Sequence, residues 1–206
     1  MPLVNDFYNN SKDIKFTYES LMINARKMLH KAKIATNIES ALRIAKAMEK
    51  DAKTRSELFC VLLDYYEHII DDVAIMSAFE LFAKSKLLRK QYIIHDLESA
   101  KDQHKIRNVQ KKQPIHIKSC LAKNYTIKET TLSTSVLLSP KYTVKYNLSD
   151  SCIKNLGFFN KTRNLLHMHE ITTYGMHLEK LEAIIELKQA IENCSPFLSG
   201  PYKLNK

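Results

Sequence analysis

The feature that most constrains this chain is a long stretch without residues that break helices. From Leu3 to Lys112 the sequence contains neither glycine nor proline. Relative to alanine, glycine costs about 1 kcal/mol and proline about 3 kcal/mol in the interior of a helix. A stretch of this length, in which apolar residues recur at intervals of three and four, favours a series of amphipathic helices. We therefore predict a mainly helical N-terminal bundle over residues 1–112.

Apolar spacing divides this half of the chain into about four predicted helices. Apolar stripes with helical spacing occupy residues 18–32, 38–52 and 58–73. A fourth segment, from Met76 to about Gln110, has helical character, but its spacing is lost at Tyr92 to His95, where bulky residues stand together. We expect the fourth helix to break there. The short connections between these segments favour antiparallel neighbours in an up-and-down bundle.

After Pro114, apolar residues alternate with polar ones at a period of two, which is typical of half-buried strands. The alternating positions are Ile115 and Ile117, then Tyr125, Ile127 and Thr131, and finally Tyr142, Val144, Tyr146 and Leu148. Ser139-Pro140-Lys141 has the composition of a turn that follows a strand ending at Leu137. We predict a small antiparallel sheet of about three strands between residues 115 and 148.

The remainder of the chain is predicted to form a loop followed by a closing helix. The loop lies around Gly157 and Asn160, and the helix extends from His177 to Asn193 with an apolar inner face. The sequence as a whole predicts an α+β fold, with a helical domain over residues 1–112 and a small α+β region over residues 113–206. The two regions can share one core.

The glycine content excludes several common classes of enzyme. The chain has only three glycines, Gly157, Gly175 and Gly200, whereas dinucleotide-binding and P-loop motifs need glycines a few residues apart. A serine nucleophile elbow also needs glycine on both sides of the serine. The longest uncharged run is far shorter than the roughly 20 apolar residues of a membrane helix, and the N-terminus has no apolar signal segment. We expect an intracellular protein, cytoplasmic or nuclear, with no membrane span and no cofactor.

Neither the cysteines nor the histidines complete a metal-binding pattern. The cysteines are widely separated, at Cys60, Cys120, Cys152 and Cys194. The densest group of candidate metal ligands is His167, His169, Glu170 and His177. We predict no metal site, and we expect the cysteines to be reduced and half-buried. His116 beside Lys118 has the residue types of a general base in phosphodiester chemistry, but the polar side of an edge strand explains this histidine better.

The charge of the chain is strongly positive and unevenly distributed. With 32 Lys and Arg against 22 Asp and Glu, the net charge is +10. Residues 51–80 carry two bases and seven acids, whereas residues 81–118 carry ten bases and three acids. The ten bases are Lys84, Lys86, Arg89, Lys90, Lys101, Lys105, Arg107, Lys111, Lys112 and Lys118. The sequence therefore predicts one acidic and one basic face.

A basic segment of this density is typical of a surface that meets phosphates, because each neutralised phosphate releases counterions. Our preferred prediction is a non-enzymatic protein that binds nucleic acid, RNA in preference, through these ten residues. Lysines make up 26 of the 32 basic residues, and lysine lacks the fork with which arginine reads guanine, so we expect weak sequence specificity. The rings that can stack on unpaired bases are Tyr92, Tyr125, Tyr142 and Tyr146.

The composition also indicates a source and leaves an alternative function open. The excess of lysine over arginine, with abundant isoleucine and asparagine, is typical of an AT-rich genome and suits a viral accessory protein. The first alternative function is a helical scaffold that binds protein, in which the acidic residues 51–80 of one copy meet the basic segment of another. Such head-to-tail contacts form rings or filaments of a homo-oligomer. A charged helix face that only keeps the protein in solution is the remaining interpretation.

The second alternative function is a metal-dependent enzyme. His68 lies in the acidic segment, and the pair His95-Asp96 begins 27 residues later. A lone histidine followed by a His-Asp pair on helices is similar to the ligand set of the HD-type metal phosphohydrolases, and the resemblance implies metal-dependent hydrolysis of phosphate esters. The chain departs from that family at Glu98 and Ser99, where a glycine and a lysine usually follow the pair. No later catalytic aspartate is identifiable.

Overall fold

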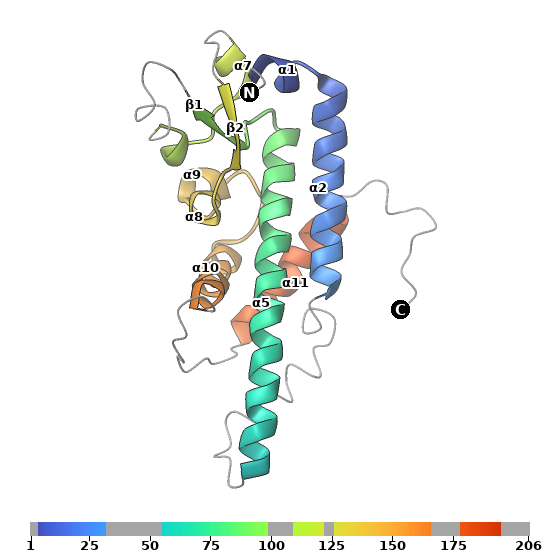
Figure 1. Ribbon diagram of the computed structural model, residues 1–206, viewed down its shortest axis with the longest axis vertical. Helices are drawn as coiled ribbons and strands as arrows, with labels where there is room; N and C mark the ends of the chain where they lie inside the picture. The colour runs from blue at the N-terminus through green and yellow to red at the C-terminus, as the bar shows by residue number, and fades with distance from the viewer. Residues whose placement is uncertain (1–3, 32–54, 99–108, 122–125, 166–177, 195–206) are drawn as a thin grey trace, which may run out of the picture. The chain divides into compact units, whose positions relative to one another are not determined.

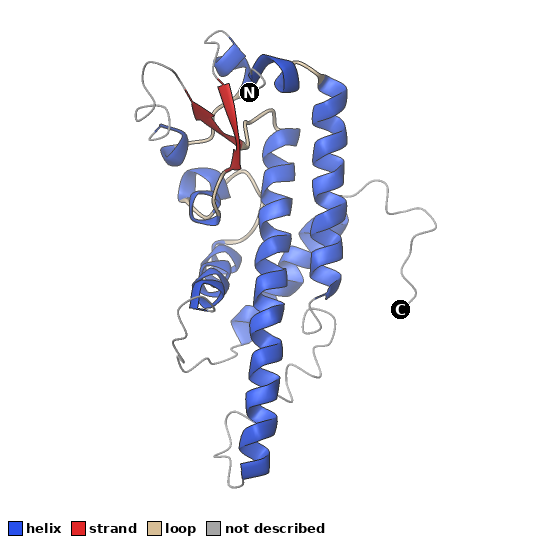
Figure 2. Cartoon of the chain, viewed as in Figure 1, coloured by secondary structure: helices blue, strands red, loops and turns tan. Residues whose placement is uncertain are grey.

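The computed structural model describes residues 4–31, 55–98, 109–121, 126–165 and 178–194. In chain order its elements are α1 (Val4–Tyr8), α2 (Ser11–Lys31), α5 (Arg55–Arg89), β1 (His95–Glu98), α7 (Ile117–Leu121), β2 (Thr126–Thr131), α8 (Thr134–Leu137), α9 (Pro140–Thr143), α10 (Asp150–Leu165) and α11 (Leu178–Asn193) (Figure 1). The mainly helical content and the small antiparallel sheet are confirmed. The restriction of helices to an N-terminal bundle is wrong, because helices occur all along the described chain (Figure 2).

The chain divides into two compact units. The first contains the described parts of residues 1–24 and 80–147, and the second contains those of residues 25–79 and 148–198. The sheet, α1 and α7 to α9 belong to the first unit, and α10 and α11 belong to the second. Both α2 and α5 contribute residues to each unit. The domain boundary predicted between residues 112 and 113 stays a prediction.

The two long helices follow the predicted apolar stripes. In α2 the buried residues Met22, Ala25 and Leu29 recur at intervals of three and four, which confirms a helix at residues 18–31. The predicted third helix is confirmed within α5, but α5 continues to Arg89 and so absorbs the start of the fourth predicted segment. Nothing between Val73 and Met76 breaks a helix, so one helix forms there. The helix predicted at residues 38–52 lies outside the described residues.

The helix α5 ends in a hydrogen-bonded turn at Gln91. The backbone N–H of Tyr92 donates to the carbonyl of Leu87 at 2.9 Å, and that of Gln91 donates to Leu88 at 2.9 Å. This is the Schellman arrangement, in which the residue after the helix adopts a left-handed conformation. Gln91 has φ 61°, so it occupies the position that glycine usually takes. The predicted break near Tyr92 is confirmed, and the predicted continuation of the helix to Gln110 is wrong.

Beyond this turn the chain is extended and forms the sheet of the first unit. β1 pairs antiparallel with β2, with His95 opposite Thr131 and Leu97 opposite Ile127. The register shifts between His95 and Leu97, which marks a β-bulge. Leu97 and Ile127 are both buried. The strand predicted around residues 125–131 is therefore confirmed, whereas β1 replaces part of a predicted helix.

A glutamine side chain supplies hydrogen bonds to β1 beyond those of β2. The Nε2 group of Gln110 donates to the His95 carbonyl at 2.7 Å, and its Oε1 accepts from the Leu97 N–H at 3.2 Å. Gln110 is only 2% exposed. The hydroxyl of Tyr142 in turn donates to the backbone carbonyl of Gln110. Gln110 thus pairs with β1 as a short strand would and prevents buried backbone groups from being left without partners.

The strands predicted to end at Leu137 and to span residues 142–148 are wrong. The structure has the short helices α8 and α9 there, and Pro140 occupies the first turn of α9, where proline fits a helix. Tyr142 and Tyr146 are 0% exposed, whereas Val144 between them is 69% exposed. A separation of four residues places two side chains on one side of a helical turn as readily as on one face of a strand. The alternating pattern was therefore ambiguous.

The second unit pairs α10 with α11. The predicted loop around Gly157 is wrong, because α10 continues through it with Cys152, Leu156 and Phe159 buried on one side. At the start of α10, the hydroxyl of Ser149 accepts the N–H of Cys152 at 3.1 Å and donates to Glu186 of α11 at 2.6 Å. The helix predicted at residues 177–193 is confirmed as α11.

We predict that Gln110→Ala lowers the free energy of unfolding by about 1–3 kcal/mol, because it leaves buried backbone groups of β1 without partners. The matched control is Gln113→Ala, since Gln113 is exposed and takes part through its backbone carbonyl. Urea denaturation followed by circular dichroism measures both variants. Equal losses in the two would show that the Gln110 side chain does not support β1.

Candidate nucleic-acid interface

The predicted basic residues are divided among several elements of the first unit. Lys84, Lys86 and Arg89 lie in the last turns of α5, Lys90 lies in the turn that follows, Lys111 and Lys112 lie in a helical turn at residues 109–112, and Lys118 lies in α7. Lys101, Lys105 and Arg107 lie outside the described residues. Arg89, Lys90, Lys111, Lys112 and Lys118 are exposed.

Three lysines from two separate segments gather around the end of α5, where Lys86 and Lys145 both lie near Lys90, and we call them the lysine cluster: Lys86, Lys90 and Lys145. The ammonium group of Lys90 donates to the backbone carbonyl of Lys145 at 2.7 Å. The ammonium group of Lys145 lies over the ring of Tyr92, 5.2 Å from its centre. The ammonium group of Lys86 lies over the ring of the buried Phe82 at 5.5 Å. Two of these cations therefore lie against aromatic rings.

The lysine cluster concentrates positive charge. Partial burial lowers the pKa of Lys90 below its usual value, and the neighbouring charges of Lys86 and then Lys145 lower it further. Among the described residues, no carboxylate forms an ion pair with any member of the cluster. An anion placed beside these groups would relieve the repulsion between them.

Lys84 lies in a different environment from the lysine cluster. Its ammonium group forms an ion pair with Glu80 at 3.8 Å, and its side chain is only 12% exposed. The Oε1 atom of Glu80 also accepts a hydrogen bond from Thr134. Lys84 is therefore neutralised locally, and we do not assign it to the interface.

An aromatic pair, Tyr92 and His116, stands beside the lysine cluster. The two residues lie opposite each other in an isolated antiparallel bridge, flanked by backbone hydrogen bonds from Ile93 to Ile115 at 3.0 Å and from Ile117 to Gln91 at 2.8 Å. Opposed residues of antiparallel strands place their side chains on the same face. The rings are 5.5 Å apart and meet edge to face at 76°. Both residues are half-buried, so part of each side chain remains accessible to solvent.

A hydrogen bond to the ring of His116 argues against the role of general base that the sequence suggested for this residue. The backbone N–H of Lys118 donates to Nδ1 of His116 at 3.3 Å. When Nδ1 accepts a hydrogen bond, the neutral imidazole carries its proton on Nε2. In this tautomer the Nε2 atom of His116 is a hydrogen-bond donor. It can donate to a phosphate oxygen, but it cannot act as a general base.

Sequence reasoning missed one member of the interface and proposed others that do not belong to it. Lys145 lies far along the chain from residues 84–118, and only the folded structure brings it to Lys90. The rings of Tyr142 and Tyr146 are fully buried, and their hydroxyls donate to backbone carbonyls, so they cannot stack on bases. Tyr125 lies outside the described residues. Of the four tyrosines proposed for stacking, Tyr92 is the one that the structure places at the interface.

The structure does not support the helical ligand set of the metal-enzyme alternative. His95 and Asp96 lie on β1, where successive side chains point to opposite faces. Asp96 accepts a hydrogen bond from Thr130 at 2.8 Å. The placement of this pair on a helix is therefore wrong. His68 lies in α5, but its side chain is outside the described part of the chain, as are His167, His169 and His177. The described residues contain no group of three or more metal ligands.

His95 instead holds α1 against β1. The hydroxyl of Tyr8 accepts the backbone N–H of Ile94 at 3.1 Å and lies 2.8 Å from Nδ1 of His95. The direction of the hydrogen bond between this hydroxyl and Nδ1 depends on which ring nitrogen of His95 carries the proton. Burial lowers the pKa of His95 below its usual value of 6.5, as does the charge of Lys84, while Asp96 opposes the shift. The folded protein therefore favours the neutral ring.

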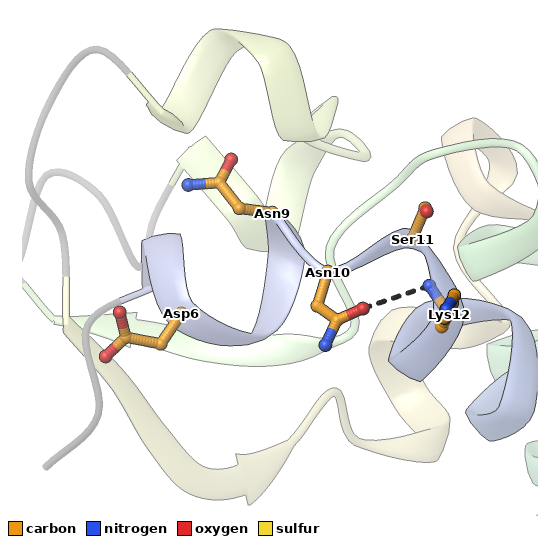
Figure 3. Close-up of a pocket in the computed structure, with 5 residues that line it drawn as sticks. All are labelled: Asp6, Asn9, Asn10, Ser11 and Lys12. Atoms are coloured by element: carbon orange, nitrogen blue, oxygen red, sulfur yellow. Dashed lines mark hydrogen bonds between the residues drawn. The ribbon is translucent and has the colours of Figure 1, made fainter.

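The connection between α1 and α2 has an open polar hollow lined by Asp6, Asn9, Asn10, Ser11 and Lys12 (Figure 3). The Oδ1 atom of Asn10 accepts the backbone N–H of Lys12 at 3.1 Å, and its Nδ2 group donates to Asp13 at 2.7 Å. These bonds satisfy backbone and side-chain groups at the start of α2. The polar groups at this hollow thus serve the start of α2, and we do not assign a ligand to it.

Comparisons with known proteins do not assign a function. No family model, curated protein or solved structure matches this chain. No described helix combines the length and apolar content needed to cross a bilayer. A function must therefore be inferred from the lysine cluster and the aromatic pair themselves.

We predict that His95 makes the stability of the protein depend on pH. Because the pKa of His95 is lower in the folded than in the unfolded state, its contribution is present above pH 6.5 and is lost as the pH falls through the folded-state pKa. The difference in unfolding free energy between the wild type and His95→Gln should shrink as the pH is lowered through this range. Urea denaturation at a series of pH values measures the difference. A difference independent of pH would contradict the role given to His95.

Proposed function

We propose that this protein binds nucleic acid, with RNA as the preferred partner, through the lysine cluster and the aromatic pair, and that it does so without catalysis. The observation that carries the proposal is the gathering of Lys86 and Lys145 around Lys90, next to Tyr92, where none of the three lysines forms an ion pair with a described carboxylate. Phosphates supply the negative charge that this surface lacks. Arg89, Lys111, Lys112 and Lys118 are further exposed cations of the same unit.

The cations at the end of α5 have a second physical role. Positive side chains in the last turn of a helix interact favourably with its carbonyl groups, typically by about 0.3–1 kcal/mol. That role accounts for Lys86 and Arg89, which lie in the last turn of α5. It does not account for Lys145, which comes from the segment after α9 and lies against Tyr92. Stabilisation of the helix end therefore explains two cations of this surface but not the third cation of the cluster, Lys145.

The chemistry of lysine favours binding to the backbone of nucleic acid. Each phosphate contact releases condensed counterions, so the affinity falls steeply as the salt concentration rises. An ammonium group is a point charge without the fixed geometry that distinguishes base edges. The interface therefore favours affinity that depends on salt and only weakly on sequence.

We predict that Lys90→Gln with Lys145→Gln weakens RNA binding and reduces the slope of log affinity against log salt by roughly 1.5, because two phosphate contacts are lost. The matched control is Lys27→Gln with Lys154→Gln, which removes the same charge from exposed lysines of the second unit. Fluorescence anisotropy with a labelled RNA, between about 50 and 200 mM salt, measures both slopes. Thermal unfolding verifies that each variant is folded.

Two results would overturn the proposal. Absence of RNA and DNA binding at the lowest salt concentration would reject it outright. Equal effects of the two double variants would show that binding reflects net charge and not the lysine cluster. Salt-dependent self-association without nucleic-acid binding, measured by sedimentation, would indicate the head-to-tail scaffold instead.

A further inference from the structure

We infer that the interface is selective for single-stranded nucleic acid, because the ring of Tyr92 stacks on an unpaired base after Lys145 moves from the ring to a phosphate. This inference rests on the proposed function and specifies the form of nucleic acid that the site accepts. It assigns separate tasks to two neighbouring side chains. Tyr92 recognises the base, and Lys145 exchanges a ring contact for a phosphate contact.

The backbone fixes the position of Tyr92 before any ligand arrives. The turn at Gln91 determines where Tyr92 leaves the helix, and the bridge to His116 holds its backbone on both sides. The edge-to-face contact with His116 then restricts the orientation of the ring. A ring held in this way loses little conformational freedom when a base stacks on it.

Lys145 covers one face of this ring in the free protein. Its ammonium group is 5.2 Å from the ring centre, a separation at which a cation is attracted to the aromatic face. At an exposed site such a contact corresponds to roughly a two- to fivefold effect on an equilibrium. Stacking of a base on an aromatic side chain corresponds to roughly a five- to 150-fold effect. Stacking therefore outweighs the contact that it displaces.

When a base occupies the ring of Tyr92, the displaced ammonium group of Lys145 finds a new partner. A base on Tyr92 brings its own phosphates to the same surface, where Lys86 and Lys90 already concentrate positive charge. The charged Lys145 side chain can then pair with one of these phosphates. The exchange replaces the ring contact of this ammonium group with a contact to an anion, which also offsets the repulsion from the neighbouring lysines.

The same geometry disfavours two other classes of polyanion. In a duplex both faces of each interior base are already stacked, so a base must first be extruded at a cost in free energy. Inorganic polyphosphate carries the charge but has no base. Both ligands can bind the lysine cluster, but neither gains the contact with Tyr92. The ring of Tyr92 should therefore distinguish among ligands that the lysines alone would not.

The first test compares Tyr92→Leu with the matched control Tyr92→Phe, which keeps the ring. The probes are a single-stranded RNA of about 12 nucleotides, the same strand in a duplex, and polyphosphate. We expect Tyr92→Leu to lower the affinity for the single strand by roughly five- to 150-fold. The affinities for the duplex and for polyphosphate should stay within about twofold of the wild type. Tyr92→Phe should retain single-strand binding.

The second test places a fluorescent reporter at the same position. The chain contains no tryptophan, so Tyr92→Trp introduces a single indole whose emission is quenched when a base stacks on it. The control is Phe16→Trp, because Phe16 is 72% exposed on α2 and lies outside the cluster. We expect the single strand to quench the indole at position 92 but not the one at position 16. Polyphosphate should bind without quenching.

The outcomes separate this inference from the proposed function. If Tyr92→Leu weakens all three probes equally, or none, while the lysine variants still weaken RNA binding, the stacking role is wrong and binding of nucleic acid by the lysine cluster stands. Equal quenching at positions 16 and 92 would also reject stacking at Tyr92. If the wild type binds none of the probes at low salt, the proposed function itself is wrong.

Discussion

The turn that ends α5 determines where the lysine cluster, the aromatic pair and β1 lie. Gln91 adopts a left-handed conformation there, and the N–H groups of Gln91 and Tyr92 close the last turn of the helix. A residue other than glycine in this conformation costs roughly 1–2 kcal/mol, so the surrounding contacts must hold it. They include the hydrogen bond from the Ile117 N–H to the Gln91 carbonyl at 2.8 Å. One short segment therefore joins the end of a long helix to the sheet and sets Lys90 near Tyr92.

The electrostatics of the first unit follow from this arrangement. Lys84 has a carboxylate partner in Glu80 one turn earlier on the same helix. The cluster that follows has aromatic and carbonyl partners instead, and these stabilise ammonium groups without neutralising them. A surface that is stabilised in this way keeps its positive potential toward solvent. That property distinguishes the lysine cluster from a helix face on which charges of both signs alternate.

Local sequence patterns predicted the helices better than they predicted how segments meet. The spacing of apolar residues identified α2 and α11, because the residues on the buried face of a helix recur at intervals of three and four. The spacing of Tyr142 and Tyr146 fits both a strand and a helical turn, and the side chains alone do not choose between them. Gly157 indicated a loop, but a single glycine costs a helix only about 1 kcal/mol relative to alanine, and the buried side of α10 outweighs it.

The sequence predicted the positive charge of the candidate interface but not all of the residues that form it. Charge density along the chain identified Lys86 and Lys90, since neighbours in sequence stay neighbours in a helix. Lys145 and the partnership of Tyr92 with His116 depend on segments that are distant in sequence, and no local pattern records which of these meet. The burial of Tyr142, which the alternating pattern had assigned to a half-exposed strand, likewise depends on Gln110 and Gln113 as partners for its hydroxyl.

The central claim is that the lysine cluster binds the phosphates of a nucleic acid. Lysine footprinting tests this claim most directly. The protein is treated with an amine-reactive reagent in the presence and absence of RNA, and mass spectrometry gives the rate of modification at each lysine. The account predicts that RNA slows modification several-fold at Lys90 and Lys145 but leaves Lys27 and Lys154 unchanged. Equal protection of all four lysines, or protection of none while RNA is bound, would contradict it.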